Sequence, residues 1–308
     1  MLGPGPNKND NRTPISPFGL ESSRWIRQAA QMRGRVSDTL PIAVLGRAYL
    51  LSTPELPTLS VPRVLGATMS APVFVLTLNG NEARRAPLLS QLDDMGIRYR
   101  LWIGFDGRHG LPAELESLVD RYGAERELGR PLGNGEIACA LSHRAIYAEI
   151  AREGLAWAIV LEEDAIIGHA FRDFVLGTAI ADFDLLLLDH KGGYGLPCRS
   201  RQMAGGGVRY RVGIAPCLTT GYAISAAAAA HLAGAAVPLR RTADWPIDIS
   251  RMNTWAAVPR IVDHPDEAAS GSSLRLERKD VVRQGFARRL TGAYWRRRMI
   301  TIFGHKLV

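Results

Sequence analysis

The amino-acid sequence predicts an α/β fold, in which helices flank a mostly parallel sheet on both faces. Apolar, β-branched segments of strand length recur along the chain, and segments with the apolar spacing of helices separate them. The strand candidates are apolar throughout rather than alternating, which is typical of parallel strands covered on both faces. We expect a single catalytic domain over residues 71–273 with a loop-rich carboxyl-terminal half.

The expected elements of the first half alternate regularly. They are a strand over 73–78, a helix over 82–95 that stops at Gly96, a strand over 99–103, a helix over 134–153, and strands over 157–161 and 184–188. Glycines cluster after residue 189, and the elements become shorter. There we expect strands over 208–214 and 218–224, a helix over 226–232, and a strand near 258–262.

The two ends of the chain differ from this body. Residues 1–70 are rich in Gly, Pro, Asn and Ser without a sustained period, which predicts a poorly ordered leader. Residues 274–308 hold ten basic and two acidic residues, so they carry the entire net charge of +8. The neutral body gives no reason to expect a nucleic-acid partner. The tail interleaves aromatic residues with arginines, which predicts an amphipathic segment in peripheral contact with an anionic membrane, although its composition alone also fits nucleic-acid contact or a solvated helix.

Cysteine spacing and the first residues bear on the compartment. Cys139, Cys198 and Cys217 lack the spacing of a disulfide framework or a metal–thiolate site, which favours reduced thiols. The start lacks the basic and apolar regions of a secretion signal. We therefore expect a cytoplasmic protein, in peripheral contact with the inner face of the cytoplasmic membrane.

Polar side chains follow four successive strand candidates, and the carboxyl ends of parallel strands share one edge of a sheet, where ligands bind. These residues are Asn79, Asp106, the triplet Glu162-Glu163-Asp164, and Asp189-His190. Three adjacent carboxylates repel one another unless a cation lies among them, and oxygen ligands suit Mg²⁺ or Mn²⁺. A solvated acidic loop or a helix N-cap is the alternative interpretation of the triplet.

Other candidates also have structural alternatives. Arg84 and Arg85 begin a helix and suit an anionic nucleotide, or are surface charges. His143 lies on one helical face with Glu136, which occupies a capping-box position. His143 itself is either a ligand contact or a core histidine. In Asp244-Trp245-Pro246-Ile247-Asp248, the indole suits stacking on a sugar and the acid suits deprotonation of a hydroxyl, unless the segment is an ordinary turn.

Taken in order, these segments resemble glycosyltransferase family 25, the lipopolysaccharide and lipooligosaccharide galactosyltransferase group. The resemblance covers about residues 72–275 and runs through six blocks: 75–85, Phe105-Asp106-Gly107, 135–143, 159–164, 219–225 and 246–248. Two residues depart from the family pattern. Glu163 stands where the family usually has the first Asp of a pair, and Ala138 replaces a glycine.

The resemblance implies a GT-A-type fold, a UDP-sugar donor, inversion at the anomeric carbon, and a divalent cation, Mn²⁺ or Mg²⁺, bound by Glu162 and Asp164. It implies a glycolipid or oligosaccharide acceptor, with a protein hydroxyl or a catalytically silent protein as alternatives. The catalytic base is expected to be Asp248, with Asp189 as its rival. The residues expected at the donor are Asn79, Arg84, Arg85, Asp106, Gly107, Ser142, His143 and Glu163.

Overall fold

Three parallel strands form the part of the fold that the sequence predicts best. In the computed structural model, β1 (Val73–Thr77) pairs in parallel with both β2 (Tyr99–Ile103) and β3 (Trp157–Glu162). Helices α2 (Glu82–Asp94) and α5 (Asn134–Arg152) precede β2 and β3 as expected. The structure describes residues 71–177, 182–203, 206–265 and 292–307. The predicted leader and the predicted domain boundary at residue 273 lie outside these ranges.

The same sheet continues through strands of mixed direction. Its order is β11-β6-β7-β9-β5-β8-β3-β1-β2, and a second, two-stranded sheet pairs β10 with β4. The reversed strand β8 lies between β3 and β5, so β5 again runs in the direction of β3 and is parallel to β9. The remaining strands are β4 (Ile166–Ile167), β5 (Leu185–Leu187), β6 (Tyr194–Gln202), β7 (Val208–Ile214), β8 (Gly221–Ser225), β9 (Thr254–Val258), β10 (Val262–Asp263) and β11 (His305–Lys306).

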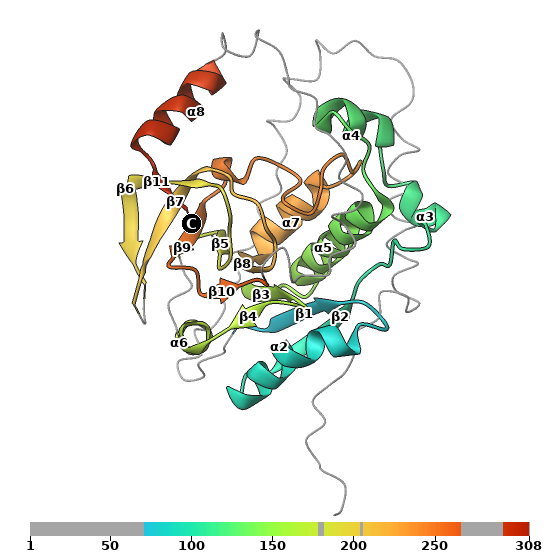
Figure 1. The fold of residues 1–308 in the computed structure, drawn as a ribbon, viewed down its shortest axis with the longest axis horizontal. Helices are drawn as coiled ribbons and strands as arrows, with labels where there is room; N and C mark the ends of the chain where they lie inside the picture. The colour runs from blue at the N-terminus through green and yellow to red at the C-terminus, as the bar shows by residue number, and fades with distance from the viewer. Residues whose placement is uncertain (1–70, 178–181, 204–205, 266–291, 308) are drawn as a thin grey trace, which may run out of the picture. The chain divides into compact units, whose positions relative to one another are not determined.

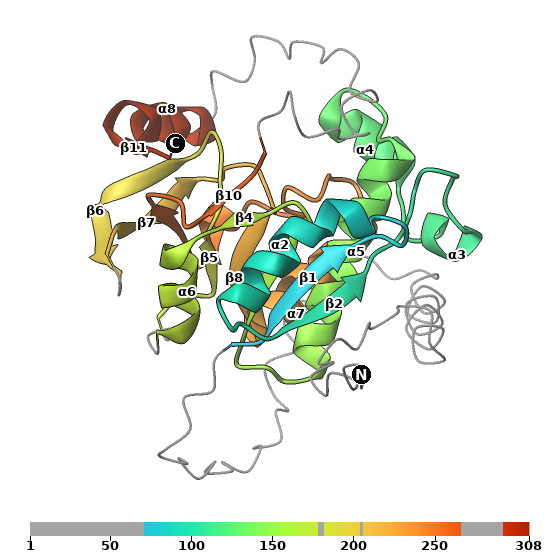
Figure 2. The same cartoon turned by 60° about the horizontal axis from the view of Figure 1, so that its bottom comes forward.

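Helices cover both faces of the sheet, as Figures 1 and 2 show. Helices α2 and α6 (His169–Leu176) lie on one face, and α5 and α7 (Ala226–Ala235) lie on the other. Successive β1 side chains divide accordingly: Val73 and Val75 join the core on the first face, and Phe74 and Leu76 the core on the second. The predicted α/β class with flanking helices is therefore confirmed.

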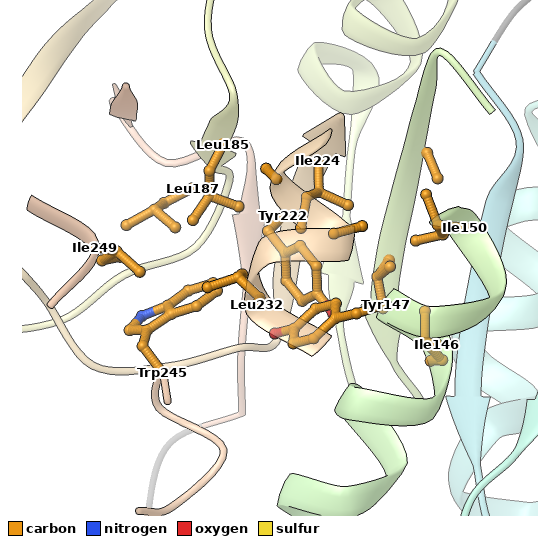
Figure 3. Close-up of a cluster of buried hydrophobic side chains, with 14 of the residues drawn as sticks. Ile146, Tyr147, Ile150, Leu185, Leu187, Tyr222, Ile224, Leu232, Trp245 and Ile249 are labelled. Atoms are coloured by element: carbon orange, nitrogen blue, oxygen red, sulfur yellow. The ribbon is translucent and has the colours of Figure 1, made fainter. Parts of the chain in front are cut away.

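An aromatic group fills the core beneath α5 and α7 (Figure 3). The ring of Tyr222 from β8 lies 6.0 Å from the ring of Tyr147 and 5.6 Å from that of Trp245, between centroids. All three side chains are buried. Burial of Trp245 corrects the expectation that its indole is available to stack on a sugar. The apolar ring gains more from this core than from an exposed position.

The second half departs from the predicted pattern in several places. The strand expected near 258–262 forms instead as β9 and β10, which Pro259 and the two residues after it separate. Proline has no amide hydrogen and cannot continue a sheet ladder. The sequence did not predict β6, the hairpin partner of β7, or helices α3 (Ala113–Glu116) and α4 (Arg121–Leu128).

The carboxyl-terminal residues that the structure describes join the sheet. Helix α8 (Gly292–Phe303) precedes β11, which pairs with β6, and Leu307 is fully buried in the core. None of the helices in the described ranges is both long and apolar enough to cross a membrane. The three cysteines have free thiols.

Candidate functional site

The acidic triplet lies where four strands of the same direction end. Glu162 is the last residue of β3, and the ends of β1, β2 and β5 share this edge. Successive side chains at a strand end point in different directions. The three carboxylates of the triplet therefore have different partners.

Glu163 faces the turn between β1 and α2. One carboxylate oxygen accepts hydrogen bonds from Thr77 Oγ1 at 2.5 Å and from the Leu78 amide at 3.4 Å. The other accepts from Asn81 Nδ2 at 2.6 Å and lies 3.3 Å from Arg84 Nε. Both oxygens are occupied, so Glu163 joins β3 to the β1–α2 turn.

Asp164 faces Arg84 from the first turn of α2. Asp164 Oδ2 accepts a hydrogen bond from Arg84 Nη2 at 2.5 Å, and side-chain exposures of 19% and 39% leave both groups in reach of solvent. Burial lowers the pKa of Arg84, but the hydrogen bond and charge of Asp164 outweigh it and raise that pKa overall. The Arg84 charge thus partly neutralises the triplet.

Glu162 contacts different elements, namely α5 and the segment just before β8. Its Oε1 accepts hydrogen bonds from His143 Nε2 at 3.0 Å and Thr219 Oγ1 at 2.7 Å. The other ring nitrogen of His143, Nδ1, lies 2.9 Å from the hydroxyl of Tyr222. Burial raises the pKa of Glu162, but hydrogen bonds from His143 and Thr219 and the charge of Arg84 lower it overall. Glu162 is therefore an anion at neutral pH.

Glu162 and Asp164 have the chemistry of a hard-cation site. Each has one carboxylate oxygen, Oε2 and Oδ1 respectively, that accepts no hydrogen bond from the described residues. Carboxylate oxygens suit Mg²⁺ and Mn²⁺. Cys139 and His143 also lie with Glu162 within 4.8 Å, ligand atom to ligand atom. Burial raises the pKa of the Cys139 thiol well above its ordinary value, so it stays protonated and is a poor ligand.

Of the expected donor contacts, three hold the loops of the site together. Arg85 donates to the Leu78 carbonyl at 3.2 Å. Ser142 Oγ accepts from the Phe105 amide at 2.8 Å and so fixes the loop after β2 to α5. A Cβ on Gly107 would lie 2.3 Å from the Asn134 carbonyl oxygen, so only glycine fits this approach.

Two further expected contacts are exposed. Asn79 lies in the turn after β1, and Asp106 follows β2. Asp106 accepts from the Arg108 side chain, and this hydrogen bond is the main reason why the pKa of Asp106 is lowered. Asn79, Arg84, Asp106 and the acidic triplet thus line the same edge of the sheet.

The structure supports the capping interpretation of Glu136. Its side chain accepts a hydrogen bond from the Gly133 amide at 3.2 Å, at the start of α5. Arg130 also donates to both of its carboxylate oxygens at 2.7 Å. Glu136 is buried and fully engaged in this cap.

The two candidate bases have contrasting environments. Asp248 caps the short helix η1 (Ile249–Arg251), where it accepts from the Ser250 amide at 3.1 Å, and 46% of its side chain is exposed. The side chain of Asp189 has no exposed surface. It lies 2.9 Å from His264 Nδ1 and 3.4 Å from Arg260 Nη1. Neither Arg260 nor His264 was predicted at the site.

A cavity of about 280 Å³ lies beside His143. Its lining includes Ala140 and Tyr147 of α5 and a segment that runs from Ala235 to Ala243. This segment therefore borders a cavity whose lining residue His143 contacts Glu162.

Sequence reasoning missed the neutral donors that organise the carboxylates. Thr77 and Asn81 bind Glu163, and Thr219 binds Glu162. All three residues belong to blocks that carry the family resemblance, 75–85 and 219–225, so a signal existed for them. Nothing in their spacing indicates which acid each one contacts.

Fold and site together define a class: an α/β protein with an anionic, oxygen-rich site at the carboxyl edge of its parallel strands. Residues 70–191 match the model of glycosyltransferase family 25 (LPS biosynthesis protein). This match agrees with the resemblance that the sequence motifs indicated, and the matched segment contains the acidic triplet and Asp189.

Curated relatives match over a similar segment. The probable inactive glycosyltransferase 25 family member 3 of Rattus norvegicus is 38% identical over 103 residues, which cover 32% of this chain and 18% of that protein. Procollagen galactosyltransferase 2 of Homo sapiens is 26% identical over 128 residues, which cover 39% of this chain and 20% of that protein. The chain thus matches only about a fifth of the length of these relatives.

One solved structure that matches this chain in part is the mannose-1-phosphate geranyltransferase of Thermus thermophilus. The similarity covers 61% of this chain and 73% of that chain, with 13% identity and a TM-score of 0.31. A similarity at this level carries no functional conclusion.

Proposed function

We propose that this chain is an inverting glycosyltransferase that moves galactose from UDP-galactose to a lipooligosaccharide- or lipopolysaccharide-type glycan. The observation that carries the proposal is that the three carboxylates of the triplet, in the segment that matches family 25, differ in how many of their oxygens are engaged. Glu163 has both oxygens engaged, whereas Glu162 and Asp164 each keep one oxygen for a ligand. Such a pair suits a cation that binds a diphosphate.

Glu162 and Asp164 would hold Mn²⁺, with Mg²⁺ as the alternative. When bound, the ion would neutralise charge on the departing diphosphate. The chain's own residues have separate tasks. Arg84 supplies a partly exposed cation beside Asp164, and Asn79 and Asp106 contact the nucleotide from the same edge. His143 fixes the orientation of Glu162 through a hydrogen bond from Nε2.

Transfer with inversion is a single displacement. The acceptor oxygen attacks the anomeric carbon while the bond to the diphosphate oxygen breaks, and a base removes the acceptor proton. Asp248 and Asp189 are the candidate bases from the sequence. The cavity beside His143 is large enough for one sugar ring, and its border of Arg240, Arg241 and Thr242 offers polar contacts.

The test is release of UDP from a panel of UDP-sugars in the presence of Mn²⁺, with and without lipooligosaccharide. We expect UDP release with UDP-galactose that increases when the acceptor is added and stops when the metal is chelated. Absence of UDP release with every donor would refute the enzymatic proposal.

A second candidate function keeps the donor and changes the acceptor to a protein hydroxyl, because some relatives are named procollagen galactosyltransferases. Transfer to a collagen-type peptide but not to lipooligosaccharide would favour it. A third candidate is a silent nucleotide-sugar-binding protein, because other relatives are named inactive. Thermal stabilisation by UDP without any turnover would favour that candidate.

A further inference from the structure

A buried carboxylate and a partly exposed histidine form a pair at the edge of the sheet that also carries the acidic triplet. Asp189 Oδ2 and His264 Nδ1 are 2.9 Å apart. The Asp189 side chain has no exposed surface, whereas 20% of the His264 side chain is exposed. Only the histidine of this pair can therefore contact a substrate.

The contact with Asp189 determines which nitrogen of His264 carries the proton. An ionised carboxylate only accepts hydrogen bonds, so Nδ1 of the neutral ring must donate to Asp189. The lone pair then lies on Nε2. Within the described ranges, no residue forms a hydrogen bond with that nitrogen. The pair thus leaves Nε2 as a proton acceptor without a partner among the described residues.

Strand pairing locates His264 near the triplet. Strand β10, which ends one residue before His264, pairs antiparallel with β4, and Asp263 lies opposite Ile166. Because the pairing is antiparallel, the chain after Asp263 runs back along the residues before Ile166. This brings His264 towards Ala165, the residue that follows Asp164. Val262 also packs over Gly221 of β8, because a Cβ on that glycine would lie 2.8 Å from the valine side chain. His264 is therefore held at the edge where β3 and β5 end.

A second metal site is a poorer explanation of these residues. Ligand atoms of Asp189, Asp263 and His264 lie within 4.8 Å of one another. However, Arg260 already lies between the carboxylates, 3.4 Å from Asp189 Oδ1 and 3.1 Å from Asp263 Oδ1. Both oxygens of Asp189 are thus engaged, by Arg260 and by His264, so this carboxylate keeps no oxygen for a metal ion, unlike Glu162 and Asp164.

We propose that His264 is the general base of the transfer reaction and that Asp189 is the residue that positions it; this inference rests on the proposed function. His264 Nε2 removes the proton of the acceptor hydroxyl as its oxygen bonds to the anomeric carbon. The bond from that carbon to the donor diphosphate breaks, and its electron pair leaves with UDP. His264 lies outside the matched segment 70–191, so the family match assigns it no role.

This assignment explains how Asp189 contributes without contacting a substrate. A fully buried carboxylate cannot reach an acceptor hydroxyl, but it can fix the tautomer and orientation of a ring in front of it. Asp248, the other candidate, already uses one oxygen to cap η1 and has no described histidine partner.

The kinetic test compares His264→Ala, Asp189→Asn and the control His231→Gln, whose residue is exposed on α7. The assay uses UDP-galactose, Mn²⁺ and lipooligosaccharide. We expect kcat to fall on the order of 10²–10⁴-fold in His264→Ala, with the KM for UDP-galactose unchanged. Added imidazole should restore part of that rate, which a purely structural role would not allow. Asp189→Asn should also lower kcat at unchanged donor KM.

The outcomes separate the two proposals. An inactive wild-type protein would refute the proposed function and this inference with it. An active wild-type protein with an unchanged kcat in His264→Ala would refute the inference alone. So would a loss that excess Mn²⁺ restores and imidazole does not, because it would indicate a metal ligand.

A second measurement does not depend on turnover or on a folded Asp189 variant. ¹⁵N-histidine NMR of the wild-type protein, assigned by comparison with His264→Gln, reports which ring nitrogen is protonated. We expect neutral His264 to carry its proton on Nδ1. A proton on Nε2 would refute the proposed arrangement.

Discussion

The ends of β3 and β5 present carboxylates at the same edge of the sheet but in opposite environments. At β3, Glu162 and Asp164 keep one oxygen each without a hydrogen bond from the described residues, and the side chain of Asp164 is 19% exposed. At β5, Asp189 is fully buried behind His264 and Arg260. The first arrangement leaves carboxylates available to a ligand. The second uses a carboxylate to hold another side chain.

The largest effect expected from this difference concerns Asp164. Replacing it with Ala removes a carboxylate that we assign to the cation, and sugar transfer should fall on the order of 10²–10³-fold or more. The fold should persist, because Arg84 still has Glu163 at 3.3 Å. Transfer rates and Mn²⁺ activation curves check the prediction, with Asp94→Ala on the exposed face of α2 as the control. Full activity in Asp164→Ala would remove the triplet from the mechanism.

The next largest effect is on stability and concerns Glu163. An N–H group faces each of its oxygens, that of Leu78 on one and that of Asn81 on the other, so the amide nitrogen of Glu163→Gln would lie against a donor. We expect the free energy of unfolding to decrease by about 2 kcal/mol. Urea denaturation measures it.

The matched control is Glu116→Gln, at an exposed pair with Arg121. Solvent screening should keep its effect below about 1 kcal/mol. Equal effects of the two substitutions would show that the buried network around Glu163 stabilises the fold no more than a surface ion pair does.

The sequence predicts the site at the end of β3 better than the site at the end of β5, because the first depends on local pattern and the second on contacts between distant residues. Apolar periodicity and the glycine after α2 locate β1, β2, β3 and α5 within one or two residues, and the triplet follows directly from β3. At β5, Asp189 itself was identified. Its partners Arg260 and His264 lie 71 and 75 residues away in the sequence, and their approach depends on how β9 and β10 are placed.

Local patterns also failed where one side chain had two plausible environments. The sequence around Trp245 suggested a sugar platform, but the ring packs against Tyr222 in the core. Adjacent acids posed the same difficulty, since sequence spacing does not say that Glu163 faces α2 while Glu162 faces His143. Both questions are decided by contacts between elements far apart in the chain.

A smaller effect is expected from His190, the next residue after Asp189. Burial lowers the pKa of His190 below its ordinary value. As pH falls below about 6.5, the unfolded chain binds a proton that the folded chain does not, so His190 makes the protein less stable towards acid. His190→Gln should therefore flatten the decrease in unfolding free energy between pH 7 and 5, by at most about 1.4 kcal/mol per pH unit.

Urea denaturation at several pH values measures this slope. The control is His231→Gln, because His231 is exposed and its replacement should leave the slope unchanged. If the unfolding free energy of His190→Gln changes with pH as steeply as that of the wild type, His190 is not the cause of the acid sensitivity.

The smallest effect concerns α8, which lies far in sequence from both strand ends but is joined to the sheet through β11. Trp295, Met299, Ile302 and Phe303 are exposed at spacings that place them along one helical face, and Arg296, Arg297 and Arg298 are exposed beside them. This arrangement supports the expected contact with anionic membranes.

Truncation is a poor test because Leu307 belongs to the core. We instead expect the double substitution Trp295→Ser and Phe303→Ser to lower co-sedimentation with phosphatidylglycerol vesicles several-fold, while Tyr122→Ser with Leu176→Ser, exposed elsewhere, leaves it unchanged. Equal pelleting of wild-type protein and the α8 variant would mean that this face is not the membrane contact.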